Sequence, residues 1–238
     1  HRRKVLSPMR QTPSQLSRGF TLIELLVAIT IMSLIALLSW RGLDGMVRSQ
    51  ANTRERSDQL VVVQNALAQW SSDMDALLPV DNTQPLNFDG QVLRLTRRSP
   101  DQPEQGMIVV AWARRMSNGT EPWLRWQSPP VNTRAGWNEA WLRAAQWART
   151  PSSSEAQRET LLFPISDWQM FYYVGGAWAN AQSSTVRSFA EQDSGGLSSA
   201  AASIPEGVRM QITLPQGQPI SGTITQDWVN PLLGGNKS

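Results

Sequence analysis

The chain has 238 residues, contains no cysteine, and carries its single histidine at position 1. Disulfides and thiolate chemistry are therefore excluded, as are His-dependent triads and His metal sites in the body of the protein. Residues 1–19 hold five of the 22 basic residues and no acidic residue, which leaves 17 basic against 19 acidic residues elsewhere. The high pI is thus partly an effect of this segment. It does not indicate a nucleic-acid partner, which needs a basic patch on a folded face.

A long apolar run follows the basic segment. Leu25–Trp40 gives 16 residues without a charge, and Phe20–Trp40 gives 21 with one, Glu24. About 20 apolar residues span a hydrocarbon core of ~30 Å as a helix. Arg41 ends the run, and the cationic flank before it predicts a cytoplasmic N-terminus with the remainder exported.

Three interpretations of this segment compete. A secretory signal has an apolar region of about 7–15 residues and a small-residue cleavage site, whereas this run is longer and Ser39-Trp40-Arg41 is a poor site. A signal anchor fits the length but does not explain Glu24, because acidic residues in spanning helices are costly and usually functional. The third interpretation rests on the residues around Glu24 themselves.

Gly19-Phe20-Thr21-Leu22-Ile23-Glu24, followed by a long apolar helix, resembles the processing motif of type IV pilin-like proteins. The resemblance implies that a prepilin peptidase cleaves between Gly19 and Phe20 and that the new Phe20 amine is N-methylated. Glu24 would then be the fifth residue of the mature chain and the assembly glutamate of the family. A buried carboxylate is tolerable opposite a cation, and the Phe20 amine of a neighbouring subunit can supply one. The competing interpretation is that Glu24 snorkels to the headgroups.

The helical composition continues beyond the membrane. No proline occurs between Pro13 and Pro79, so a helix of 59 residues over 20–78 would reach ~90 Å. Its periplasmic half carries an apolar seam with 3-4-3-4-3 spacing, which suits packing on a β-sheet. The seam is Leu60, Val63, Leu67, Trp70, Met74 and Leu77, and the opposite face carries Gln59, Asn65, Gln69, Ser72 and Asp73.

After Pro79 the pattern becomes that of strands. Strands are expected at 91–97, 107–115 and 123–127, with a turn containing Asn118-Gly119 between the last two. Residues 136–150 are spaced like a helix face, although a strand is possible there. Two strands are expected within 159–174, and a closing hairpin at 207–214 and 220–229. The Ser-, Ala- and Gly-rich stretch 180–203 predicts a flexible surface loop.

These elements predict an α+β, pilin-like fold, in which a long N-terminal helix, membrane-spanning in its first half, packs on an antiparallel β-sheet. The expected organisation has five parts: a removed basic leader (1–19), a transmembrane and assembly helix (20–40), its periplasmic continuation (41–78), a β-rich periplasmic domain (79–230) and a tail (231–238).

The later features narrow the resemblance. A bulky Trp-Gln-Met-Phe-Tyr strand, a stretch of small polar residues, a strand at 207–214 and a last strand ending in Asp-Trp-Val follow one another, with Trp-Arg-Gly-Leu-Asp-Gly-Met directly after the membrane helix. This order is similar to that of J-type minor pseudopilins of the type II secretion system. Related minor pilins of type IV pili share the architecture.

Catalytic and metal sites find little support in the sequence. Asp73 and Asp75 lie two residues apart and diverge on a helix, so no catalytic residue, cofactor or metal site is expected. Oxygen ligands in Asp81–Gly90 could suit Ca²⁺, but the spacing fits no EF-hand and such clusters are mostly turns. Eleven tryptophans, crowded in the middle third, indicate core and half-buried sheet surface more than a ligand platform.

The resemblance therefore implies a structural subunit, not an enzyme, anchored in the bacterial inner membrane with a periplasmic body. Its partners would be a prepilin peptidase, I- and K-type minor pseudopilins and the major pseudopilin, in a pseudopilus tip that helps protein export across the outer membrane. One alternative is a minor pilin serving adhesion, DNA uptake or motility. Another is a membrane-anchored periplasmic module that binds a ligand on its tryptophans.

Overall fold

The structure is a computed structural model, and it describes residues 19–81, 83–99, 104, 106–117, 119–184, 186 and 204–231. The chain divides into two compact units, residues 1–52 and residues 53–238. Helix α1 (Leu22–Asp75) contributes residues to both units. The basic leader before Gly19, most of the predicted loop 180–203 and most of the predicted tail lie outside the described residues.

The second unit contains two antiparallel sheets. The five-stranded sheet has the order β1-β2-β3-β4-β5, and its strands are β1 (Leu86–Phe88), β2 (Val92–Arg98), β3 (Met107–Arg114), β4 (Pro122–Gln127) and β5 (Glu159–Pro164). The four-stranded sheet has the order β7-β6-β8-β9, and its strands are β6 (Asp167–Val174), β7 (Ala177–Asn180), β8 (Gly207–Leu214) and β9 (Gly222–Val229). Helix α2 (Arg134–Arg149) and the short α3 (Ser153–Ala156) separate β4 from β5.

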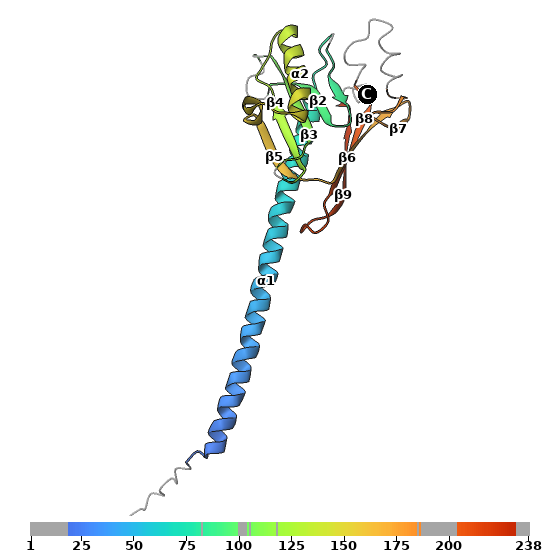
Figure 1. Ribbon diagram of the computed structural model, residues 1–238. Coiled ribbons are helices and arrows are strands. Elements are labelled where there is room, and N and C mark those ends of the chain that lie inside the picture. Colours follow the sequence, from blue (N-terminus) through green and yellow to red (C-terminus); the bar gives the residue numbers. More distant parts are fainter. Residues whose placement is uncertain are drawn as a thin grey trace, which may run out of the picture. The chain divides into compact units, whose positions relative to one another are not determined.

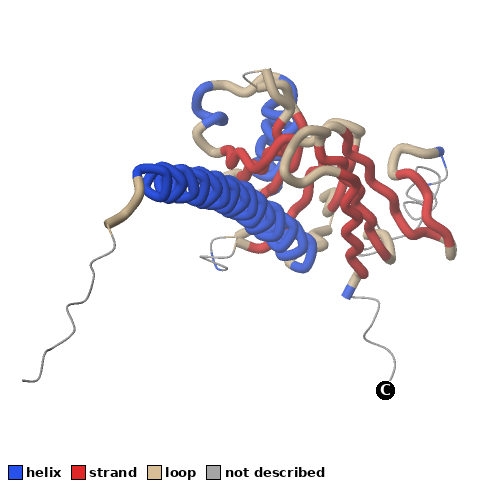
Figure 2. The backbone as a smooth tube through the Cα atoms, turned by 90° about the horizontal axis from the view of Figure 1, so that it is seen from below, coloured by secondary structure: helices blue, strands red, loops and turns tan. Residues whose placement is uncertain are grey.

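Successive side chains along a strand point to opposite faces of the five-stranded sheet. Both faces carry apolar side chains, so one apolar core forms on each face. On β3, Val110 and Trp112 face the core shared with α1 and the four-stranded sheet, while Val109, Ala111 and Ala113 face α2. Helix α2 lies against the five-stranded sheet and away from the four-stranded sheet in both views (Figure 1, Figure 2). The layers are therefore α2, then the five-stranded sheet, then the end of α1 with the four-stranded sheet.

The segment 136–150, for which the sequence allowed either a helix or a strand, is helical in the structure up to residue 149, as part of α2. Thr133 caps its start by accepting a hydrogen bond from the Gly136 amide at 3.1 Å, a preferred N-cap arrangement. Its apolar face follows the helical period and is buried against the sheet. That face is Trp137, Ala140, Trp141, Ala144, Trp147 and Ala148.

The last turns of α1 are held by a buried carboxylate. Asp73 is fully buried, and its oxygens accept hydrogen bonds from the Trp112 indole at 2.9 Å, from Arg125 Nε and Nη2 at 2.8 and 2.9 Å, and from Arg97 Nη1. Gln69 Nε2 adds a bond at 3.0 Å. The expectation that Asp73 lies on the solvent-facing side of the helix is wrong, because the two arginines on β2 and β4 compensate its charge inside the body.

The long helix ends three residues earlier than predicted. Beyond Asp75 the backbone pairs with β2 instead: Leu77 forms a bridge with Arg97, and the Leu78 amide donates to the Thr96 carbonyl at 2.9 Å. The strand predictions at 91–97, 107–115, 123–127, 159–174, 207–214 and 220–229 are confirmed, with small shifts at their ends. Together the elements confirm the predicted α+β, pilin-like fold class.

Candidate functional site

The amino-terminal motif lies at the start of helix α1. Gly19 and Phe20 precede the first helical residue, Leu22, and the Phe20 side chain is exposed. A peptidase needs access to a peptide bond whose backbone groups are not engaged in helical hydrogen bonds. The peptide bond between Gly19 and Phe20 meets this condition, since α1 begins two residues beyond it.

Thr21 and Glu24 form a capping box at the start of α1. Glu24 Oε2 accepts hydrogen bonds from the Thr21 amide at 3.0 Å and from the Thr21 hydroxyl at 2.8 Å. The Thr21 hydroxyl lies 3.4 Å from the Glu24 amide and accepts its hydrogen bond. Such reciprocal bonds satisfy amides that the first helical turn leaves without partners. The sequence reasoning missed this role, although the Thr-x-x-Glu spacing is its signature.

The first half of α1 exposes apolar side chains all round. Among the described residues, α1 is the one helix that is long and apolar enough to cross a membrane. Two hydroxyl groups in this half are satisfied within the helix, because Thr30 donates to the Leu26 carbonyl and Ser33 to the Ile29 carbonyl, each at 2.8 Å. These two hydroxyl groups are therefore paired where hydrocarbon would offer no partner.

The tryptophan-rich third of the chain does not provide an open binding platform. Trp112, Trp123, Trp126, Trp137, Trp141 and Trp147 are each at most 8% exposed. Some are paired through their indole nitrogens, as in Trp137 with Thr96 at 2.9 Å and Trp147 with Glu159 at 2.7 Å. The prediction of a core role is confirmed, and a ligand platform on these six residues is excluded.

The oxygen-rich segment Asp81–Gly90 is used by the fold. Asn87 lies on β1 and accepts a hydrogen bond from Arg94 Nη2 at 2.8 Å, while Asp89 Oδ1 caps the β1–β2 turn by accepting from the Gln91 and Val92 amides at 3.0 Å each. The described residues include no group of three His, Cys, Asp or Glu side chains that could hold a metal.

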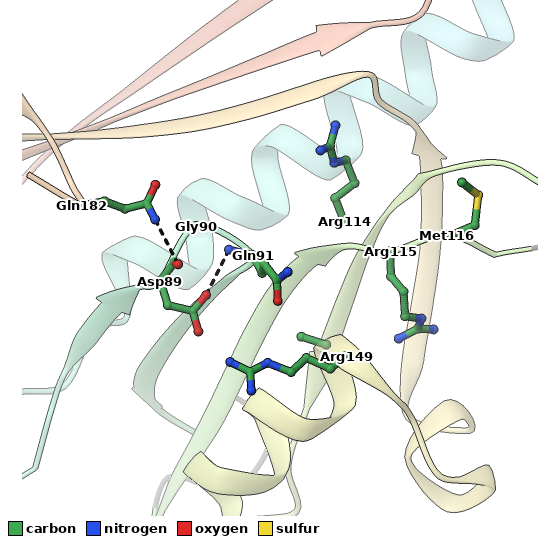
Figure 3. Close-up of a pocket in the computed structure, with 9 residues that line it drawn as sticks. Asp89, Gly90, Gln91, Arg114, Arg115, Met116, Arg149 and Gln182 are labelled. Atoms are coloured by element: carbon green, nitrogen blue, oxygen red, sulfur yellow. Dashed lines mark hydrogen bonds between the residues drawn. The ribbon is translucent and has the colours of Figure 1, made fainter.

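A polar cleft of about 840 Å³ opens beside this turn (Figure 3). Its walls come from the β1–β2 turn, the end of β3, the end of α2 and the segment after β7. The lining residues are Asp89, Gly90, Gln91, Arg114, Arg115, Met116, Ala148, Arg149 and Gln182. Sequence reasoning missed this cleft, because the residues come from four separate stretches of the chain.

Two of the arginines in this cleft are held by carboxylates. Arg115 donates to both oxygens of Glu159, at 3.1 and 2.9 Å, and to the Trp147 carbonyl at 2.9 Å. Arg114 donates to the Ser166 carbonyl, and its Nη1 lies 3.6 Å from Glu121 Oε2. The Arg149 guanidinium makes no hydrogen bond or ion pair with any other residue that the structure describes. The cleft therefore contains fixed positive charges and one guanidinium with free donors.

Comparisons with known proteins agree with the amino-terminal motif. Residues 15–40 match the model of the prokaryotic N-terminal methylation motif. Over 170 residues the chain is 26% identical to type II secretion system protein J of Vibrio cholerae, which covers 68% of this chain and 72% of that relative. No solved structure matches the chain. The motif and this identity support a J-type minor pseudopilin, and with the apolar helix they suggest anchoring in the inner membrane.

Proposed function

We propose that this chain is a minor pseudopilin, a structural subunit at the tip of the type II secretion pseudopilus that helps protein export across the outer membrane. It acts with I- and K-type minor pseudopilins and with the major pseudopilin. The observation that carries the proposal is the Gly19–Glu24 motif, placed at the start of an exposed apolar helix in a chain with 26% identity to a protein J.

The proposed processing follows from the order of the residues. A prepilin peptidase removes residues 1–19 on the cytoplasmic face, and the Phe20 amine is methylated. Residues 20–40 then anchor the chain in the inner membrane, and the remainder of α1 carries the periplasmic body. No catalytic residue, cofactor or nucleic acid takes part in this role.

Glu24 has a double role in this proposal. Its Oε2 already accepts two hydrogen bonds from Thr21, but an ionised carboxylate offers about four acceptor positions. The carboxylate can therefore keep its capping bonds and also pair with the Phe20 amine of a neighbouring subunit. An apolar surrounding makes that pairing strong, since an unpaired charge there is costly.

Two substitutions separate the capping role from the charge role. Glu24→Gln keeps a side chain that can complete the capping box but removes the charge, whereas Glu24→Ala removes both. In membranes that also contain prepilin peptidase and I- and K-type subunits, we expect both variants to be inserted and cleaved. Both should lose co-purification with those subunits from detergent extracts.

Glu55→Gln is the matched control, because it removes one carboxylate from an exposed position of the same helix. We expect it to co-purify like the unmodified chain. Unchanged co-purification of Glu24→Gln would show that the charge is dispensable and that Glu24 serves as a cap alone. Co-purification with pilus subunits in place of I- and K-type subunits would favour the minor pilin alternative.

A further inference from the structure

The polar cleft beside the β1–β2 turn carries more positive than negative charge. Arg114 and Arg115 are matched by Glu121 and Glu159. Behind the wall of the cleft, Arg94 Nη2 lies 4.0 Å from Asp89 Oδ2. Arg149 is the fourth arginine of this group, and the structure shows no carboxylate for it among the residues that it describes. Among the residues that the structure describes, one positive charge of this group is therefore uncompensated.

The position of Arg149 in the fold favours a positive charge. Arg149 lies in the last turn of α2, where the helix dipole favours a cation. Burial lowers the pKa of Arg94, and the nearby Arg149 charge acts in the same direction, against the favourable effect of Asp89. An anion near Arg149 would relieve this repulsion between two guanidinium groups.

The opposite wall is built by a close approach of two segments. Gly90 has a φ of +95°, and a side chain there would collide with the Gln182 amide. Gln182 Nε2 crosses the turn and donates to the Asp89 carbonyl at 3.1 Å. In Figure 3 the Arg149 guanidinium lies below Asp89 and Gln91, within the space that this wall bounds. The cleft is therefore bounded on its glycine side by a turn whose positive φ at Gly90 disfavours other residues.

We infer that this cleft binds a single carboxylate of a partner protein, an Asp or Glu side chain that pairs with Arg149. Guanidinium groups recognise carboxylates through paired donors. Asp89, Glu121 and Glu159 stand close by, so a polyanion such as a nucleic acid or an anionic membrane would be repelled. A carboxylate flanked by peptide amides fits better, because the exposed Asp89 carboxylate of the wall can accept from those amides. That the carboxylate belongs to a protein rests on the proposed assembly role.

The chain offers a convenient probe of this cleft. It contains no cysteine, and Met116 lines the cleft with 63% of its surface exposed. Met116→Cys, labelled with an environment-sensitive fluorophore, therefore places a single reporter at the cleft. The full chain in detergent micelles is titrated at low salt with acetyl-Gly-Glu-Gly-amide, with acetyl-Gly-Gln-Gly-amide and with inorganic phosphate.

We expect a saturable response to the glutamyl peptide and at least fivefold weaker binding of the glutaminyl peptide. Arg149→Gln should weaken glutamyl binding at least fivefold. Arg134→Gln is the matched control, since Arg134 is exposed at the other end of α2, about 22 Å away along the helix; it should bind as the parent does.

Several outcomes would overturn the inference. Equal binding of both peptides, or no saturable response, would exclude a carboxylate site. Phosphate binding tighter than glutamyl binding would assign the cleft to free oxyanions, and equal losses in both arginine variants would reduce the effect to net charge. None of these outcomes bears on cleavage or on Glu24, because the titration involves neither peptidase nor other subunits.

Discussion

The Trp112 indole nitrogen donates a hydrogen bond to the Asp73 carboxylate at 2.9 Å, and both residues are fully buried. This contact joins β3 to the last turn of α1. With Arg97 and Arg125 on the neighbouring strands, it fixes which side of α1 faces the sheet. The apolar seam of α1 alone would tolerate small rotations of the helix, whereas a carboxylate with partners on three strands allows one orientation.

Replacing Asp73 should therefore destabilise the body strongly. Asp73→Asn leaves the buried Arg97 and the half-buried Arg125 without a carboxylate, and breaking a buried ion pair costs about 3–5 kcal/mol. Urea unfolding of the full chain in detergent, followed by tryptophan fluorescence, measures the free energy of unfolding. Asp58→Asn, at an exposed position of α1, should change it by less than about 0.5 kcal/mol. If Asp73→Asn lowers the free energy of unfolding by less than about 1 kcal/mol, Asp73 does not fix the orientation of α1 as described.

Tyr172 makes the free energy of unfolding of the body decrease at alkaline pH. Burial raises the pKa of its hydroxyl, and the described part of the chain offers that hydroxyl no hydrogen-bond partner. A tyrosine in the unfolded chain ionises near pH ~10. The free energy of unfolding does not depend on this ionisation below that pH and falls as the pH rises toward the higher folded pKa, because the unfolded state then binds fewer protons.

Tyr172→Phe should remove this part of the alkaline decrease in stability. We expect equal or higher stability at pH 7, by up to about 1 kcal/mol, because an unpaired buried hydroxyl disappears. The decline in the free energy of unfolding above pH ~10 should become shallower than in the parent. The control is Tyr173→Phe, at the half-buried neighbouring position. An alkaline decline as steep in Tyr172→Phe as in the parent would assign the sensitivity to another group.

The interface between α2 and the five-stranded sheet should tolerate no extra volume at Ala144. This residue is fully buried against the sheet, and overpacking a filled core costs about 1–3 kcal/mol. Ala144→Leu should lower the denaturation midpoint accordingly. Leu142→Lys, two residues away on the exposed face at 68% exposure, should leave it nearly unchanged. Equal effects of the two substitutions would show that the α2 interface is loosely packed.

The sequence predicts the motif-bearing and alternating parts of this fold well. Alternation of apolar and polar residues predicts the hairpin of β8 and β9, and 3-4 spacing predicts most of the packed face of α1, although Leu60 of the predicted seam is 42% exposed. Each of these patterns is local. Thr21 and Glu24 are also local, and the capping box could have been found from their spacing.

The parts that sequence reasoning missed depend on long-range partners. Asp73 is spaced like a solvent-facing residue, and only Arg97 and Arg125, distant in sequence, make its burial possible. Strand β1 lies in a segment rich in turn-forming residues and is held by pairing with β2. The polar cleft likewise exists only after β3, α2 and the segment after β7 have been brought together.

The central claim is that this chain is processed as a prepilin, and intact mass measurement tests it most directly. The full chain is co-expressed with an active prepilin peptidase, purified from membranes and weighed. We predict the loss of residues 1–19 and the addition of one methyl group, located on Phe20 by fragmentation, with Gly19→Val remaining uncleaved. An uncleaved parent chain, beside a known prepilin that the same peptidase cleaves, would contradict the account.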